Sequence, residues 1–208
     1  MKQLLKSSLT CLMSIAALLA CNNQKSTVDE GDENLIEDDA THYHEQEIAE
    51  GVTWDDDEIE VFMKSAGMID KMQIKLGDLV KEKAELEAVG GYAEQIQRDH
   101  AHSLENLKKI AQEKGVTISG TLDAKHQAKI DSMMLIDDHF DREFLKMMVK
   151  AHKKDITMYQ NAMQSISFQH PVKDWIDSNI PKLQQHQFTA QRLLDDENLF
   201  PETASDAP

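Results

Sequence analysis

Apolar residues recur every three or four positions from Thr53 to about Asp196, and this pattern constrains the fold more than any other feature of the chain. Such spacing places apolar side chains along one face of an α-helix. In the segment from about 54 to 83, which Thr53 is predicted to cap, the repeat is Phe62, Ala66, Ile69, Gln73, Leu76 and Val80. The chain has only 8 Gly, 4 Pro and 5% aromatic residues, whereas a β-sandwich or barrel needs more turn residues and β-formers. The sequence therefore predicts an all-α fold.

The same pattern predicts four long helices and one short one. The long helices span about 54–83, 87–114, 137–166 and 171–196, and the short helix spans about 123–134. The first and last joints between long helices are short, so each of these joints makes an antiparallel hairpin. The middle joint is about 22 residues long, which is enough for an overhand connection. We therefore predict a ferritin-like four-helix bundle over residues 53–196, with the extra short helix in the connection between the second and third long helices.

The N-terminus is typical of an exported protein. Residues 1–21 begin with a positive region containing Lys2 and Lys6, and continue with the apolar run Leu9–Ala20. This run is 12 residues long, too short for a membrane span of about 20 residues. The segment ends in Leu-Leu-Ala-Cys, which resembles the bacterial lipobox and predicts that Cys21 carries the lipid anchor. The alternative is an ordinary signal peptide that happens to contain a cysteine.

The segment that follows is predicted to be a tether. Residues 22–52 contain ten Asp or Glu and one Lys, a composition that cannot bury enough apolar surface to offset the entropy of ordering. The residue after the lipidated cysteine is Asn22 rather than Asp, which by resemblance to other lipoproteins favours the outer membrane. Residues 197–208 are predicted to be a frayed tail. The predicted partner is therefore a membrane reached through lipid. Nucleic acid is disfavoured because the net charge is −16.

A polar residue interrupts the apolar face of each long helix near its middle. These residues are Gln73, His100, His152 and His186. Measured along helices that rise 1.5 Å per residue, the four positions fall in roughly one central layer. Asp99, Asp155 and Tyr159 are the predicted supporting residues around it. Asp141 lies 11 residues before His152, about 16 Å along the helix, and so cannot act in the same layer.

Two interpretations of this layer remain open. In the first, the three histidines bind one transition metal ion, Zn, Fe or Cu, with Gln73 or a carboxylate completing the shell. In the second, the histidines are packed core groups that fix the register of the helices. A metal-dependent oxidase or hydrolase is a third alternative. A di-iron oxidase is disfavoured, because such sites need Glu-x-x-His pairs and the residues three before the histidines are Gln97, Val149 and Leu183.

Several short motifs, in order along the four long helices, resemble a bacterial ferritin-like family. They are Leu76-Gly77-Asp78-Leu79, Asp99-His100, Phe140-Asp141 followed by His152, and Ile180-Pro181-Lys182-Leu183 followed by His186. The family is domain-of-unknown-function family four-one-four-two, often labelled "predicted outer membrane protein", and the resemblance covers residues about 59–194. It implies an exported helical bundle with no established activity. Many relatives carry a glutamate where this chain has Gln73, so this chain lacks a hard anionic ligand at that position.

Together these features predict an outer-membrane lipoprotein that carries a ferritin-like bundle on an acidic tether. They favour a binding or stress-associated module over an enzyme, because no phosphate loop, serine nucleophile elbow or cysteine nucleophile is present. The rival prediction is a purely structural or interaction bundle. The sequence leaves open the protein partner, the oligomeric state and the side of the membrane.

Overall fold

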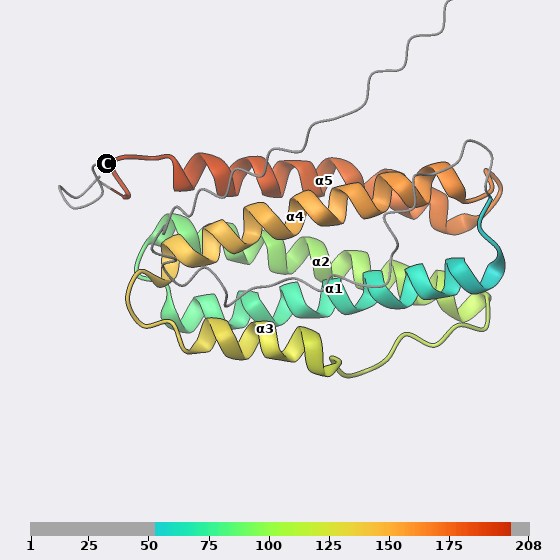
Figure 1. Cartoon of the computed structure of the whole chain (residues 1–208), viewed down its shortest axis with the longest axis horizontal. Helices are drawn as coiled ribbons and strands as arrows, with labels where there is room; N and C mark the ends of the chain where they lie inside the picture. The colour runs from blue at the N-terminus through green and yellow to red at the C-terminus, as the bar shows by residue number, and fades with distance from the viewer. Residues whose placement is uncertain (1–52, 201–208) are drawn as a thin grey trace, which may run out of the picture. The chain divides into compact units, whose positions relative to one another are not determined.

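A computed structural model describes residues 53–200 of the chain, which form five α-helices and, within that range, no strand (Figure 1). The helices are α1 (Asp56–Lys83), α2 (Glu87–Glu113), α3 (Ala124–Met134), α4 (Phe140–Ser165) and α5 (Pro171–Leu194). The all-α prediction is confirmed. The predictions for the signal segment, Cys21 and the acidic tether lie outside the described residues, as do those for positions 201–208.

The helix ends differ from the predicted ones for local reasons. Asp55, not Thr53, caps α1: its carboxylate accepts from the Glu58 backbone N–H at 2.9 Å, and the Glu58 side chain accepts from the Asp55 N–H at 2.9 Å. α2 ends just before Gly115, whose φ of 75° is the left-handed conformation that glycine favours at this position. α4 begins at 140 rather than 137, because His139 adopts a left-handed backbone with φ of 60°.

Two apolar clusters form the core, one toward each end of the bundle. The first, here the Trp175 cluster, includes Phe62 and Ala66 of α1, Leu104 and Leu107 of α2, Ile156 and Tyr159 of α4, and Trp175 and Ile176 of α5. The second, here the Phe144 cluster, includes Leu76 and Val80 of α1, Val89 and Ile96 of α2, Ile130 and Met133 of α3, Phe144 and Met148 of α4, and Ala190 and Leu193 of α5.

The order in which each helix meets the two clusters gives the topology. α1 and α5 run from the Trp175 cluster to the Phe144 cluster, whereas α2 and α4 run in the opposite direction. α2 and α4 are therefore parallel, and the connection between them has to return along the length of the bundle, as Figure 1 shows. This overhand connection carries α3, which packs on α1. The ferritin-like bundle with an extra short helix in this connection is confirmed.

Between the two clusters, the four long helices share a polar layer. Its buried members are Asp70 and Gln73 of α1, His100 and Ser103 of α2, His152 and Asp155 of α4, and His186 of α5. Buried polar groups are costly unless each finds a partner. The layer is therefore the part of the core whose composition needs an explanation.

The C-terminal turn is more ordered than predicted. Residues 197–200 belong to the predicted frayed tail, but Leu199 and Phe200 pack against the Phe144 cluster. The Arg142 guanidinium lies 5.0 Å from the centroid of the Phe200 ring and donates to the Phe200 carbonyl at 3.3 Å. Partial burial of the Phe200 ring and this cation–π contact extend the folded region past α5.

Within residues 53–200, no helix has the length and apolar character that a membrane crossing requires.

Candidate metal centre

Three histidines from three helices meet at the middle of the bundle. His100 of α2, His152 of α4 and His186 of α5 are at most 3% exposed. Their ring centroids are 5.1 to 5.8 Å apart, and one ring nitrogen of each lies within 4.8 Å of the other two. The structure thus brings together the three residues that the sequence placed in one layer.

Hydrogen bonds orient the imidazoles of His100 and His152. The His152 Nδ1–H donates to the Met148 carbonyl at 2.9 Å, so the lone pair of this ring is on Nε2. His100 Nδ1 lies 2.7 Å from the Asp70 carboxyl, which leaves its Nε2 turned toward His152. The two Nε2 atoms are 3.5 Å apart. Two nitrogens bound about 2.05 Å from one tetrahedral ion lie about 3.3 Å apart, so this spacing suits a shared metal.

His186 completes the set with its other ring nitrogen. Its Nε2 is hydrogen-bonded to Asp99 at 2.8 Å, and its Nδ1 is buried with no hydrogen-bond partner. Each of the three rings therefore has one nitrogen held by a protein oxygen, whereas the other nitrogen makes no hydrogen bond to a protein oxygen. Metal-binding histidines in proteins show this same arrangement, because the outer hydrogen bond fixes the ring and its tautomer.

Burial also keeps two of these rings neutral. Burial lowers the pKa of His152 well below its usual value, and the nearby rings of His100 and His186 lower it further. Burial is also the main cause that lowers the pKa of His186, although its hydrogen bond to Asp99 acts in the other direction. A metal ligand must be a neutral imidazole. Both rings are therefore in the ligand form near neutral pH.

Asp70 is the site residue that sequence reasoning missed. It is fully buried, and burial raises the pKa of its carboxyl despite the hydrogen bond to His100. The predicted apolar face of α1 ran through Ile69, but Ile69 is only half-buried and the neighbouring Asp70 takes the inward position. The available signal was its spacing of three residues before Gln73, which places both side chains on one helix face.

Gln73 lies in the layer with its amide unused. The side chain is fully buried, and neither its Oε1 nor its Nε2 has a hydrogen-bond partner. Asp70 Oδ2, Asp155 Oδ2 and His186 Nδ1 are also buried without one. Four residues of one layer thus have buried polar atoms without a hydrogen-bond partner, whereas buried polar atoms in native proteins are nearly always paired. His100, His152 and His186 each offer a ring nitrogen, and these three nitrogens lie within 4.8 Å of one another. The three histidines therefore fit a metal ion, which would give a buried imidazole nitrogen a partner.

The other predicted supporting residues lie at different distances from the centre. Asp155 is buried on α4, and burial raises the pKa of its carboxyl to about 7; the charge of His100 opposes that rise. Tyr159 belongs to the Trp175 cluster, where its ring centroid is 5.6 Å from Phe62 and 5.2 Å from Trp175. The structure therefore places Tyr159 among aromatic rings two turns beyond His152.

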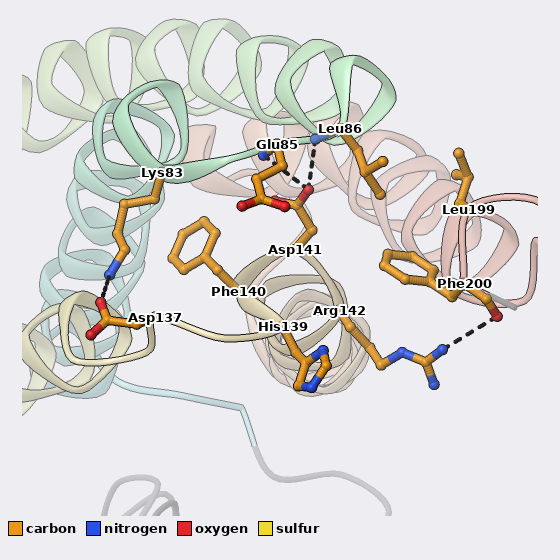
Figure 2. A pocket seen from close by; sticks show the side chains of 10 residues that line it. All are labelled: Lys83, Glu85, Leu86, Asp137, His139, Phe140, Asp141, Arg142, Leu199 and Phe200. Carbon is orange, nitrogen blue, oxygen red and sulfur yellow. Dashed lines mark hydrogen bonds and ion pairs between the residues drawn. The ribbon is translucent and has the colours of Figure 1, made fainter. Parts of the chain in front are cut away.

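Phe140 and Asp141 lie at the far end of α4 and have a different role. The Asp141 carboxylate accepts from the backbone N–H groups of Glu85 at 3.1 Å and Leu86 at 2.8 Å. Because α2 has no capping side chain of its own, Asp141 supplies one from another helix. Figure 2 shows this contact beside a cavity of about 220 Å³ whose lining includes Phe140. None of the three histidines lines this cavity.

The fold and the site together define a ferritin-like helical bundle with a buried histidine centre. The family model described as "Domain of unknown function (DUF4142)" matches residues 44–193, and the chain belongs to this family. The crystal structure of a DUF305 fragment from Deinococcus radiodurans is similar at 14% identity, with a TM-score of 0.57 over 65% of this chain and 93% of that chain. At this identity the likeness concerns the fold alone. None of the curated proteins matches the chain.

Proposed function

We propose that this protein binds one transition metal ion in its histidine layer and that it does so as a lipoprotein of the bacterial cell envelope. The observation that supports metal binding most directly is that His100, His152 and His186 each offer a ring nitrogen and that these three nitrogens lie within 4.8 Å of one another. Imidazole ligands suit Zn, Fe or Cu. Gln73 on α1 is the fourth candidate ligand, through its unpaired Oε1.

The competing function is structural. In that case a proton takes the place of the metal: His100 Nε2–H donates to His152 Nε2, and a protonated Asp70 donates to His100 Nδ1. The raised pKa of Asp70 is compatible with this arrangement. It leaves His186 Nδ1 and Gln73 Oε1 unpaired, and these are two atoms that a metal ion could bind.

Elemental analysis decides between the two. Full-length protein is purified without a chelator or a histidine tag, and its metal content is measured against protein concentration. We expect about one Zn, Fe or Cu per chain, and less than a tenth of that in His152→Ala. A metal-free wild type that also takes up no metal on dialysis would establish the structural role. An enzyme would additionally have to show turnover that depends on the bound metal.

The location of the protein is a second part of the proposal. It rests on the signal-like residues 1–21, on Cys21 at the end of the Leu-Leu-Ala-Cys sequence and on the acidic residues that follow. Several acyl chains on one cysteine give stable anchoring to a membrane. The absence of Asp after Cys21 favours the outer membrane.

Cys21→Ser tests the anchor. Labelled palmitate is expected to enter the wild type and not the variant, and the variant is expected to leave the outer-membrane fraction. Cys11→Ser is the matched control, because Cys11 would be removed with the signal segment. If Cys21→Ser still fractionates with the outer membrane, the lipid anchor is not at this residue.

A further inference from the structure

The exposed side of α4 concentrates positive charge in an otherwise acidic chain, which has 38 Asp and Glu against 22 Lys and Arg. Between positions 144 and 165 this helix contains only one acid, Asp155, and that residue is buried. The same stretch contains four exposed lysines: Lys146, Lys150, Lys153 and Lys154. Side chains spaced three and four residues apart leave a helix on one side, so these lysines form one stripe, here the lysine face.

The bundle supplies few carboxylates to the lysine face. Lys146 pairs with Glu143 at 2.8 Å. Within the part of the chain that the structure describes, neither Lys150 nor Lys153 has a carboxylate within ion-pair distance. Lys64 of α1, by contrast, pairs with a glutamate one turn earlier. Like charges at helical spacing repel one another, so an acidic partner on this face would relieve that repulsion.

The chain enters the bundle beside the end of α4. The Trp54 backbone N–H donates to the Ser165 carbonyl at 2.8 Å, which joins the first described residues to the last turn of this helix. The residues before position 53 therefore start from the same helix that carries the lysine face. The family model also begins ahead of the described residues, at position 44, so residues 44–52 belong to the domain that the family shares.

Residues 44–52 match the lysine face in charge and in length. They include Glu45, Glu47 and Glu50 and no Lys or Arg. At 1.5 Å per residue, the lysine face lies about 16 to 29 Å from Ser165 along α4. At about 3.3 Å per residue, an extended chain places Glu50 about 13 Å and Glu45 about 30 Å from Trp54. The three glutamates can therefore reach the whole length of the face.

We propose that residues 44–52 bind along the lysine face of α4 as a strap, with Glu45, Glu47 and Glu50 paired with its ammonium groups. Only the residues between Cys21 and position 44 then act as the spacer to the membrane. Exposed ion pairs are individually weak and are screened by salt, so the strap is released at high ionic strength. The strap does not involve the histidine layer and is independent of metal binding.

Carbodiimide coupling tests the contact, because this reagent joins a carboxylate to an amine when the two groups meet. In the full-length protein at low salt, we expect it to link Glu45, Glu47 or Glu50 to the lysine face, as mapped by mass spectrometry on the monomer band. The Glu60–Lys64 pair of α1 is the internal standard for the reaction. In 0.5 M NaCl, the links to the lysine face are expected to fall at least about fivefold.

Charge reversal gives a matched comparison. Lys150→Glu with Lys153→Glu is expected to abolish the links and to speed cleavage after Glu50 by a glutamate-specific protease at least about fivefold. Lys108→Glu with Lys109→Glu reverses two exposed lysines of α2 and is expected to leave the links and the cleavage rate unchanged.

A charge swap completes the series. Adding Glu45→Lys and Glu47→Lys to the reversed α4 variant is expected to restore the links and the slow cleavage after Glu50. If Glu60 couples to Lys64 but residues 44–52 do not couple to the lysine face, the strap is wrong.

Two further results would assign the lysine face to another partner and overturn the strap. Links found only between two chains would assign it to a second copy of the protein. The remaining result is equal cleavage of wild type and the reversed α4 variant, with binding to phosphatidylglycerol vesicles by wild type alone. That result would assign the face to an anionic membrane surface.

Discussion

The two apolar clusters and the polar layer between them are equally buried, but they differ in what completes them. In the Trp175 cluster the rings of Phe62, Tyr159 and Trp175 pack at centroid distances of 5.2 to 6.3 Å, and each contact is made within the chain. In the layer, Gln73 and His186 keep polar atoms with no partner. The clusters therefore account for the folding of the bundle, whereas the layer lowers its stability unless another group binds there.

Within one core, the apolar clusters are therefore tied to stability, whereas the polar layer is tied to the proposed function. Apolar packing stabilises the bundle whether or not a ligand is present. The layer contributes to stability only through what it binds, by mass action on the folded state. Substitutions in the two regions should therefore respond differently to metal and to chelator.

The largest effect is expected in the Trp175 cluster. Phe62→Ala removes a fully buried ring that contacts Trp54, Tyr159 and Trp175, and is expected to cost about 3–5 kcal/mol of unfolding free energy. Urea denaturation should give the same loss in EDTA and in excess Zn²⁺, because the cluster does not touch the ion. A loss that depends on metal would mean that the two regions are not independent.

The next effect is expected in the layer and should depend on metal. With free Zn²⁺ at 100 times its dissociation constant, wild type is expected to gain about 2.7 kcal/mol over its stability in EDTA. His152→Ala should remove this gain, because one of the three inward nitrogens is lost. His102→Ala is the control, since His102 is an exposed histidine on the same helix as His100. An unchanged gain in His152→Ala would place the metal elsewhere in the protein.

The sequence predicted the clusters well because helical periodicity is a local property. The ends of α1 to α5 lie within about three residues of the predicted ends. The rise per residue of a helix was enough to predict that the polar positions of the four long helices lie at one level. The tertiary contacts were not predictable in this way. Asp141 caps α2 from α4, a pairing of residues more than fifty positions apart that no local pattern encodes.

The layer was predicted in part. His100, His152 and His186 stood out because a polar residue on an apolar face is conspicuous. Asp70 did not, because a regular spacing of three and four assigned the inward position to Ile69. In the structure α1 is turned so that Asp70, rather than Ile69, faces the core, and the Asp70 carboxyl orients His100. Only packing against the other helices determines how a helix is turned in this way.

A smaller effect is expected when an anionic group is restored at Gln73. Gln73→Glu places a carboxyl where neither polar atom now has a partner, so in EDTA the variant should unfold at lower urea than wild type. In Zn²⁺ or Fe²⁺ the carboxylate becomes a ligand, and we expect a gain about 1–2 kcal/mol larger than that of wild type. The extra gain should vanish when His152→Ala is added. If Gln73→Glu shows no metal-dependent shift, Gln73 does not face the three histidines.

The smallest effect is a slope in the pH dependence of the metal-free protein. The folded Asp155 carboxyl keeps its proton up to a pKa of about 7, whereas the same group in the unfolded chain has a pKa of 3.8. Between these two values folding takes up a proton, so this group lowers the stability of the folded state as the pH rises. Asp155→Asn has no such proton to take up. In EDTA, the stability of the variant minus that of wild type should therefore rise with pH between about 4 and 7, by at most about 1.4 kcal/mol per pH unit, and then level off. Lys153→Met is the control, because Lys153 is exposed on the same helix and its substitution should give no comparable slope. A constant difference across this range would mean that Asp155 is ionised in the folded protein, and that the layer already supplies the positive charge this carboxylate needs.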